Sequence, residues 1–234
     1  MRRIISPEIL DGLEPDDPRA VGSRRDLRRL NRLMGSTTHV LRALRSANGG
    51  SDTGPILDLG AGDGDFALRI ASGLPRVRSS RMSLLDRRAR PTPEIAQGLA
   101  ALGWQLECLE EEVVSWLAKA GDRSWSAIFA NLFLHHFEDS VIARMLEQIS
   151  ERTPVFIAFE PRRSALALCF SKLVRLIGCN PVTAHDAPVS VRGGFRDKEL
   201  SALWPAGNRG WKLREVRAGP FGHLFFAHHS SSSR

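Results

Sequence analysis

Cysteine is rare in this chain: the 234 residues include only Cys108, Cys169 and Cys179, and no two of them form a C-x-x-C pair. An odd number of cysteines without paired spacing argues against both a disulfide framework and a structural zinc site. Long apolar runs are also missing, since none approaches the roughly 20 residues that a membrane-spanning helix needs. The first residues lack the apolar core of a secretory signal. These absences predict free thiols, no membrane span and a cytoplasmic location.

Lysine is scarce as well. Four of the 33 basic residues are lysines, which leaves 29 arginines, and the formal net charge is +7. A basic chain with a pI near 10.3 is compatible with a nucleic-acid partner. Because arginine replaces lysine throughout, however, we attribute the charge to compositional bias. The densest cluster, five arginines from Arg24 to Arg32, is expected to be a solvated helix face. Nucleic acid is therefore not the expected partner.

The length suffices for one α/β domain with a small lid, and not for two full domains. Residues 1–50 are predicted to form an N-terminal helical arm or lid. In this arm Ser6-Pro7-Glu8 is a helix-start signal. Apolar residues then recur at helical spacing over 23–45, with Gly35 as an interruption. Residues 51–234 are predicted to form the main domain, in which the stretch at about 178–208 breaks the pattern and is interpreted as a lid-like insertion.

From residue 55 onwards, strand-like and helix-like segments alternate. The order of five predicted strands, with helices between them, is typical of a parallel sheet covered on both faces. Two further strands, at 211–217 and 224–227, are joined by a turn so short that they must pair antiparallel. The sequence therefore predicts an α/β fold with a mostly parallel seven-stranded sheet, helices on both faces and a terminal antiparallel strand pair. The five parallel strands are predicted at 55–59, 82–85, 105–109, 126–134 and 154–159.

The first predicted strand leads into a glycine-rich turn that reads Asp58-Leu59-Gly60-Ala61-Gly62-Asp63-Gly64-Asp65. Alternate glycines let the backbone turn sharply and let a ligand approach closely. A dinucleotide site favours G-x-G-x-x-G, but here an aspartate stands where the third glycine would be. Asp58, Asp63 and Asp65 surround the place where a pyrophosphate would have to bind, and anions favour helix N-termini that lack such acids. The turn therefore suits a ligand with a cationic amine and a sulfonium. The P-loop motif GxxxxGK[ST] is absent, which excludes that class of nucleotide enzyme.

The D-x-G-x-G-x-G form of this turn resembles the first motif of the class I S-adenosylmethionine-dependent methyltransferases. The closing antiparallel pair also resembles the seven-stranded sheet of that family. The resemblance is specific over residues 55–161 and weaker over 211–227. It implies S-adenosylmethionine as the cofactor, with Gly60, Gly62 and Gly64 beneath its methionine part. It also implies that Asp58 contacts the amino group and that Asp86, which ends the second strand, accepts hydrogen bonds from the ribose hydroxyls.

Three more cofactor-binding residues are predicted. After the third strand the family places an acid or amide near the adenine, and Glu112 fits this position better than the two glutamates before it. Asn131 and Leu132 are predicted at the carboxyl edge of the fourth strand, where ligands bind in open α/β folds. The next residues, Leu134-His135-His136, resemble the "LHH" segment of many small-molecule methyltransferases, including those of quinone biosynthesis. The NPP[YF] motif and the Pro-Cys motif of nucleic-acid methylation are absent.

Methyl transfer is an in-line displacement at a sulfonium carbon, so the enzyme supplies alignment, exclusion of water and a deprotonated acceptor. A phenol, with a pKa of about 10, needs a base, and histidine is the usual one. His135, His136 and His185 are the candidates, and the sequence leaves the choice among them open. No metal site is expected, because His135 and His136 lack the i, i+4 spacing that places two ligands on one helix face.

Contacts with the substrate are predicted for Arg192, Glu160 and Met34. The arginine stands in the lid-like insertion, the glutamate follows the fifth strand, and the methionine belongs to the apolar face of the N-terminal arm. The predicted function is methyl transfer from S-adenosylmethionine to a small molecule, at a phenolic oxygen of an aromatic or polyketide-like compound. An RNA or protein methyltransferase that uses the basic surface is the alternative, and a binding protein without catalysis is a third possibility.

Overall fold

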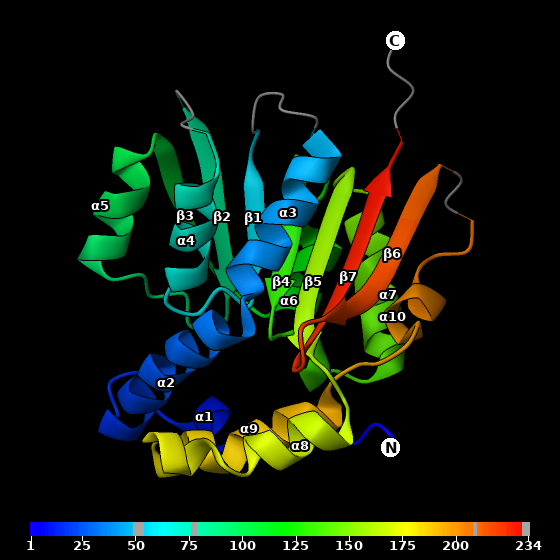
Figure 1. The fold of residues 1–234 in the computed structure, drawn as a ribbon. Helices are drawn as coiled ribbons and strands as arrows, with labels where there is room; N and C mark the ends of the chain where they lie inside the picture. Colours follow the sequence, from blue (N-terminus) through cyan, green and yellow to red (C-terminus); the bar gives the residue numbers. More distant parts are fainter. Residues whose placement is uncertain (49–53, 76–78, 208–209, 231–234) are drawn as a thin grey trace.

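The computed structural model describes residues 1–48, 54–75, 79–207 and 210–230, and its centre is one mixed β-sheet (Figure 1). The seven described strands lie in the order β3-β2-β1-β4-β5-β7-β6. Neighbours among β1 to β5 run parallel, whereas β7 pairs antiparallel with both β5 and β6. The predicted sheet and its terminal antiparallel pair are confirmed. The strands are β1 (Ile56–Leu59), β2 (Ser80–Asp86), β3 (Trp104–Glu110), β4 (Ala127–Asn131), β5 (Val155–Pro161), β6 (Trp211–Ala218) and β7 (Gly222–His229).

Helices cover both faces of the sheet, as predicted (Figure 1). Side chains alternate along each strand, so that Ile157 and Phe159 of β5 pack on one side while Phe156 and Ala158 pack on the other. Every residue of β5 is buried, which is typical of a central strand with both faces covered. One face carries α3 (Ser36–Asn48), α4 (Asp65–Gly73) and α5 (Pro93–Ala101), and the other carries α6 (Val113–Lys119), α7 (Asp139–Ser150) and α10 (Glu199–Leu203).

The other helices lie together beyond the carboxyl ends of β1 and β4, at the bottom of the view in Figure 1. They form a layer over the edge of the sheet at which open α/β folds bind their ligands. None of the described helices is both long enough and apolar enough to cross a membrane. The helices of this layer are α1 (Ile9–Gly12), α2 (Pro18–Met34), η1 (Leu134–His136), α8 (Ala165–Ser171), η2 (Val174–Ile177) and α9 (Pro181–Gly193).

The interruption predicted at Gly35 is confirmed. Helix α2 begins with Pro18 at its first position, and the side chain of Asp17 accepts a hydrogen bond from the backbone N–H of Arg19. It ends at Gly35, which has a φ of +67°. Since glycine adopts this left-handed conformation without steric cost, the chain can start α3 in a new direction.

The stretch 178–208 is mostly helical, which corrects the expectation of an irregular insertion. Helix α9 has 13 residues, and the side chain of Asn180 caps it by accepting the N–H of Thr183. Pro188 inside this helix, and the glycines that end it, obscure its periodicity in the sequence. The boundary predicted at residues 50 and 51, and residue 208 at the end of the insertion, lie outside the described residues. A lid role for either segment stays a prediction.

Two other predicted element limits were wrong. The helix-start signal at Ser6 is unused: α1 begins at Ile9, and the carboxylate of Asp186 from α9 accepts the N–H groups of Ile9 and Leu10, at 2.9 and 3.0 Å. A carboxylate from a distant helix thus caps α1 in place of the local serine. The fourth strand stops at Asn131 instead of continuing to residue 134, because Leu132 turns the backbone to a φ of +53°.

Candidate active site

The glycine-rich turn after β1 lines a cavity of about 720 Å³, which we call the loop cavity. Gly60 and Gly62 have φ values of +71° and +54°, a conformation that glycine adopts readily. A Cβ built on Gly62 would meet no atom within 4 Å, so the space above this residue is open to a ligand. Gly64 lies behind the turn: a Cβ there would come within 2.9 Å of the Leu84 side chain. Its role is therefore close packing of the turn on β2.

Asp58 is a buried acid in the lining of the loop cavity. It is 1% exposed, and its Oδ2 atom has no hydrogen-bond partner among the described residues. Burial raises the pKa of Asp58 well above its usual range, and the charges of Asp86 and Asp63 raise it further. Asn131, at the end of β4, also has a buried oxygen without a described partner in this lining. Since buried polar atoms are nearly always hydrogen-bonded, both atoms point to a ligand that donates hydrogen bonds.

Asp86 ends β2 at the next position along the sheet edge and also lines the loop cavity. Its Oδ2 accepts the backbone N–H of Gly62 at 3.0 Å, and its Oδ1 accepts the N–H of Arg88 at 2.8 Å. These bonds hold the turns after β1 and β2 together. Each carboxylate oxygen retains a further acceptor site, so Asp86 can still receive a hydroxyl hydrogen from a ligand.

The ring of acids expected around the turn is partly neutralised by arginines. Asp63 forms an ion pair with Arg28 of α2 at 2.5 Å, and Asp65 forms one with Arg69 at 2.7 Å. The second pair has i, i+4 spacing and could have been read from the sequence; the first depends on where α2 lies. Asp58 and Asp86, by contrast, have no arginine partner among the ion pairs of the described residues.

The N-terminal segment forms one wall of the loop cavity. Arg88, after β2, ties it there by donating to the carbonyl of Leu13. Within the segment, Arg24 donates to the carbonyl of Pro15. The amide of Asn131 donates to Asn31 Oδ1 of α2 at 3.2 Å. Sequence reasoning missed Asn31, since nothing in its local pattern distinguishes it from a surface residue. Part of the basic cluster thus holds the chain together across a cavity instead of forming a free solvated face.

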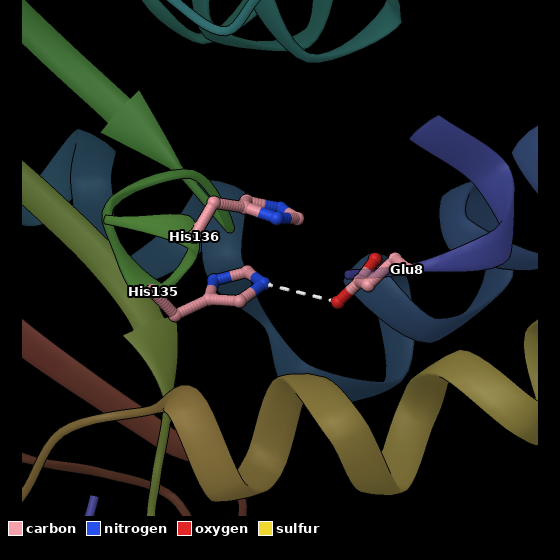
Figure 2. A group of neighbouring side chains, drawn as sticks. All are labelled: Glu8, His135 and His136. Atoms are coloured by element: carbon pink, nitrogen blue, oxygen red, sulfur yellow. Dashed lines mark ion pairs between the residues drawn. The ribbon is translucent and has the colours of Figure 1, made fainter. Parts of the chain in front are cut away.

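A second cavity of about 520 Å³, the histidine cavity, adjoins the first and contains Glu8, His135 and His136 (Figure 2). His135 is buried between two carboxylates, with its Nδ1 2.8 Å from Glu160 and its Nε2 3.5 Å from Glu8. Burial alone would lower the pKa of His135, but the hydrogen bonds and charges of Glu160 and Glu8 outweigh it and raise the pKa to about 9. His135 is therefore a fixed imidazolium at neutral pH.

Glu160 fixes the turn that carries the histidines. It is fully buried, and its Oε1 accepts the N–H groups of Phe133 and Leu134 at 3.0 and 2.8 Å while its Oε2 bonds to His135. Leu132 begins this turn in the left-handed region, which is rare for leucine and costs on the order of 1 kcal/mol or more. Such strain is typically found at ligand sites. The expected substrate residue Glu160 thus has both oxygens bonded to the protein and no exposed surface.

His136 differs from its neighbour. Its Nδ1 lies 3.5 Å from Asp11, and its side chain is 24% exposed toward the histidine cavity. Burial and the positive charge of His135 lower the pKa of His136, despite the opposing influence of Glu8 and Asp11. A histidine with a lowered pKa is neutral at pH 7 and can accept a proton from a ligand.

Glu8 is the residue of this cluster that the sequence did not reveal. Burial would raise its pKa, but the hydrogen bond and charge of His135, followed by His136 and Ser190, outweigh burial and lower it. Glu8 is held in place by Ser190, whose hydroxyl donates to its Oε1, and by the Asp186 cap on the residues that follow it. Its position arises from contacts between segments about 130 and 180 residues apart, for which the local sequence carries no signal.

The remaining predicted residues lie in different places. His185 is 53% exposed and bonds to Asp186 at 2.8 Å, and neither it nor Arg192 lines any of the cavities described here. Glu112 lines the histidine cavity, but its carboxylate also caps α6 by accepting the N–H of Ser115 at 2.8 Å. Met34 lines a third, apolar cavity.

Glu8, His135 and His136 each offer one atom that could coordinate a metal ion, and these atoms lie within 4.8 Å of one another. A divalent ion would have to displace the proton that His135 holds beside Glu8. The two carboxylates around His135 favour that proton, since they raise its pKa to about 9. The spacing argument from the sequence does not exclude a metal ion here, and the absence of a metal site stays a prediction.

The sequence matches no protein-family model and no curated protein, whereas several solved structures are similar. The plantazolicin methyltransferase BamL, in complex with a triazolic desmethylPZN analog and SAH, is 12% identical with a TM-score of 0.64, over 93% of this chain and 93% of that chain. Magnesium protoporphyrin IX methyltransferase from Synechocystis PCC 6803, with bound SAM, is 13% identical with a TM-score of 0.53, over 95% and 88%. The mitomycin 7-O-methyltransferase MmcR is 20% identical with a TM-score of 0.53, over 94% and 60%. At these identities the likeness is one of fold, and this chain has the Rossmann-like fold of the class I S-adenosylmethionine-dependent methyltransferases.

Proposed function

We propose that this chain transfers a methyl group from S-adenosylmethionine to a phenolic oxygen of a small aromatic molecule. The observation that carries the proposal is the buried, unpartnered Asp58 carboxylate in the same cavity as the open backbone at Gly62. A ligand that carries a cationic amine on an unbranched chain would match both features, because the amine can donate to Asp58 and the chain can pass over Gly62. The similar structures support this choice, since those described above are methyltransferases that act on small molecules.

The residues of the loop cavity fit this cofactor. Asp58 would accept hydrogen bonds from its amino group, and the backbone at Gly60 and Gly62 would pass beneath its methionine part. Asp86 would accept from its ribose hydroxyls, and Asn131 has a free carbonyl oxygen for a further donor. When bound, the cofactor supplies a methyl group on a positively charged sulfur, and the chain's own task is to position the acceptor and take its proton.

The histidine cavity would hold the acceptor, because it shares Gly60, Asp86 and Leu132 with the loop cavity. His136, neutral at pH 7, takes the phenolic proton while the oxygen forms its bond to the methyl carbon. The electron pair of the broken carbon–sulfur bond stays on sulfur, which becomes a neutral thioether. Glu160 and Glu8 engage both ring nitrogens of His135, so its part is indirect: its positive charge helps to keep the pKa of His136 low.

Incubation with labelled S-adenosylmethionine and a panel of phenols tests the proposal. We expect label on the oxygen of at least one phenol and one equivalent of S-adenosylhomocysteine per methyl group. Label on RNA instead, with binding that weakens steeply as salt rises, would favour the alternative function. Binding of the cofactor without transfer to any phenol, RNA or protein would favour a binding protein.

The proposed role of His136 leads to a prediction about metals. Treatment with EDTA should leave the methylation rate unchanged, because the proposed transfer uses His136 as its base and needs no metal ion. Initial rates before and after EDTA, and after addition of Mn²⁺ or Zn²⁺, provide the measurement. Loss of activity that either metal restores would show that Glu8, His135 and His136 bind a metal ion.

A further inference from the structure

A third cavity, of about 410 Å³, adjoins the other two and is lined mainly by apolar side chains. We call it the apolar cavity. Leu30 and Met34 line it from α2, Ala167 from α8 and Val174 from η2. The proposed reaction uses none of these residues, and the cavity is too large to be a packing defect, since an interior void seldom exceeds the size of a water molecule.

The apolar cavity is continuous with the proposed reaction site. Leu10, Leu27 and Leu132 line all three cavities. Glu8 and Ser190 line both the histidine cavity and the apolar cavity. A molecule whose reacting oxygen lies at His136 could therefore extend directly into the apolar cavity.

The chemistry of the lining decides what such an extension can be. Glu8 and Asp186 are the two ionisable residues among those that line the apolar cavity, and both are already engaged. Glu8 bonds to His135 and Ser190, and Asp186 caps α1 and bonds to His185. No charged group of the described lining is left to bind a polar substituent, so the occupant is apolar.

The same surface remains apolar where it reaches solvent. Leu33, Leu176 and Ile177, which all line the cavity, are 71%, 81% and 61% exposed. Large apolar side chains grouped at a cavity mouth mark a binding surface. An occupant longer than the cavity can continue along these side chains.

We propose that the apolar cavity binds a hydrocarbon chain of the methyl acceptor, so that the substrate is an amphiphile with a phenolic head and an apolar tail. The phenolic head lies at His136, and the apolar tail lies between helix α2 and the helices α8, η2 and α9. This inference rests on the proposed methyltransferase function and adds the class of substrate.

A series of 4-alkylphenols with increasing chain length tests the inference. Dissociation constants are measured by calorimetry with S-adenosylhomocysteine present, and KM and kcat are measured separately by methyl transfer. We expect affinity to increase by up to roughly fourfold per added methylene until the cavity is filled, with little change in kcat. Because binding is measured without turnover, the binding site for the tail is tested even if no phenol is methylated. A failure to methylate any phenol would count against the proposed function alone.

Leu30→Trp is the informative variant, because Leu30 is half-buried and the larger side chain fills part of the cavity. It should weaken binding of long-chain phenols by roughly tenfold or more while leaving short ones unchanged. Leu213→Trp is the matched control, since Leu213 lies on β6, is 38% exposed and lines none of the described cavities. Ile177→Glu, at an exposed position, provides a second test should the first variant fold poorly.

Affinity that is independent of chain length would overturn the inference. So would a folded Leu30→Trp protein that binds long and short phenols as the wild type does. In either case the apolar surface would belong to a second copy of the chain or to a lipid surface, and Ile177→Glu would then change oligomeric state or vesicle binding without changing phenol affinity.

Discussion

Replacing Asp58 by asparagine should stabilise the ligand-free protein and weaken cofactor binding at the same time. Asp58 is buried, and one of its oxygens has no partner among the described residues. Folding must therefore either bind a proton to this acid or bury an unpaired charge, and both cost free energy at pH 7. We expect Asp58→Asn to increase the free energy of unfolding by about 1–2 kcal/mol at pH 7, which is a rise in Tm of about 2–8 °C for a chain of this size. Affinity for S-adenosylmethionine should fall roughly 10- to 100-fold, because a charge-assisted hydrogen bond is lost.

The pH dependence of the unfolding free energy explains why the Asp58→Asn variant is expected to be more stable than the wild type. The pKa of Asp58 is raised in the folded state, so the folded protein holds a proton that the unfolded chain releases at about pH 4. The wild type therefore loses stability as pH rises from that value toward the raised pKa. The variant should lack this loss, and the difference between their unfolding curves isolates Asp58. Asp122→Asn, at an exposed position away from the cavities, should change neither quantity. A less stable Asp58→Asn protein with unchanged affinity would contradict the assignment.

Replacing His136 by glutamine should lower kcat by roughly 10²–10⁴-fold, which is the usual contribution of a general base. Affinity for the cofactor should change little, because His136 lines the histidine cavity and not the loop cavity. In the wild type, kcat/KM should fall at low pH, where His136 is protonated. That fall should lie below the ordinary histidine pKa of 6.5, because burial and the charge of His135 lower it. The acidic limb should disappear from the pH profile of the variant.

The control for this variant is the same substitution at His185. That residue is 53% exposed and lines none of the described cavities, so His185→Gln should retain the wild-type rate and pH profile. If His185→Gln is the inactive variant, His185 of α9 is the base among the three candidate histidines, and the assignment of His136 fails. A His136→Gln protein that keeps the acidic limb would show that another group sets the pH dependence.

The sequence was informative wherever a function depends on consecutive residues. The strand, the glycine turn and the acid before it are contiguous, so the sequence predicted that Asp58, Gly60 and Gly62 lie together, and all three line the loop cavity. The order of strands and helices likewise predicted the sheet, because parallel strands need a helical crossover between them. His135 and His136 were singled out because their segment resembles a known one, although the turn that carries them was predicted as strand up to residue 134.

Contacts between segments that lie far apart in the sequence could not be predicted. Glu8 reaches the histidines because Asp186 caps the following helix, and Arg28 neutralises Asp63 because α2 crosses the turn. No local pattern encodes such contacts. The argument from three acids around the turn therefore overestimated the negative charge there, because Asp63 and Asp65 are paired with arginines. Helix α9 was missed for a different reason, since Pro188 disrupts the periodicity by which a helix is recognised.

A crystal structure with S-adenosylhomocysteine would test the central assignment most directly. We predict one molecule in the loop cavity, with its amino nitrogen within hydrogen-bonding distance of Asp58 Oδ2, its ribose at Asp86 and its methionine part above Gly62. A diphosphate lying over Gly62, or a loop cavity that stays empty at saturating ligand, would contradict it.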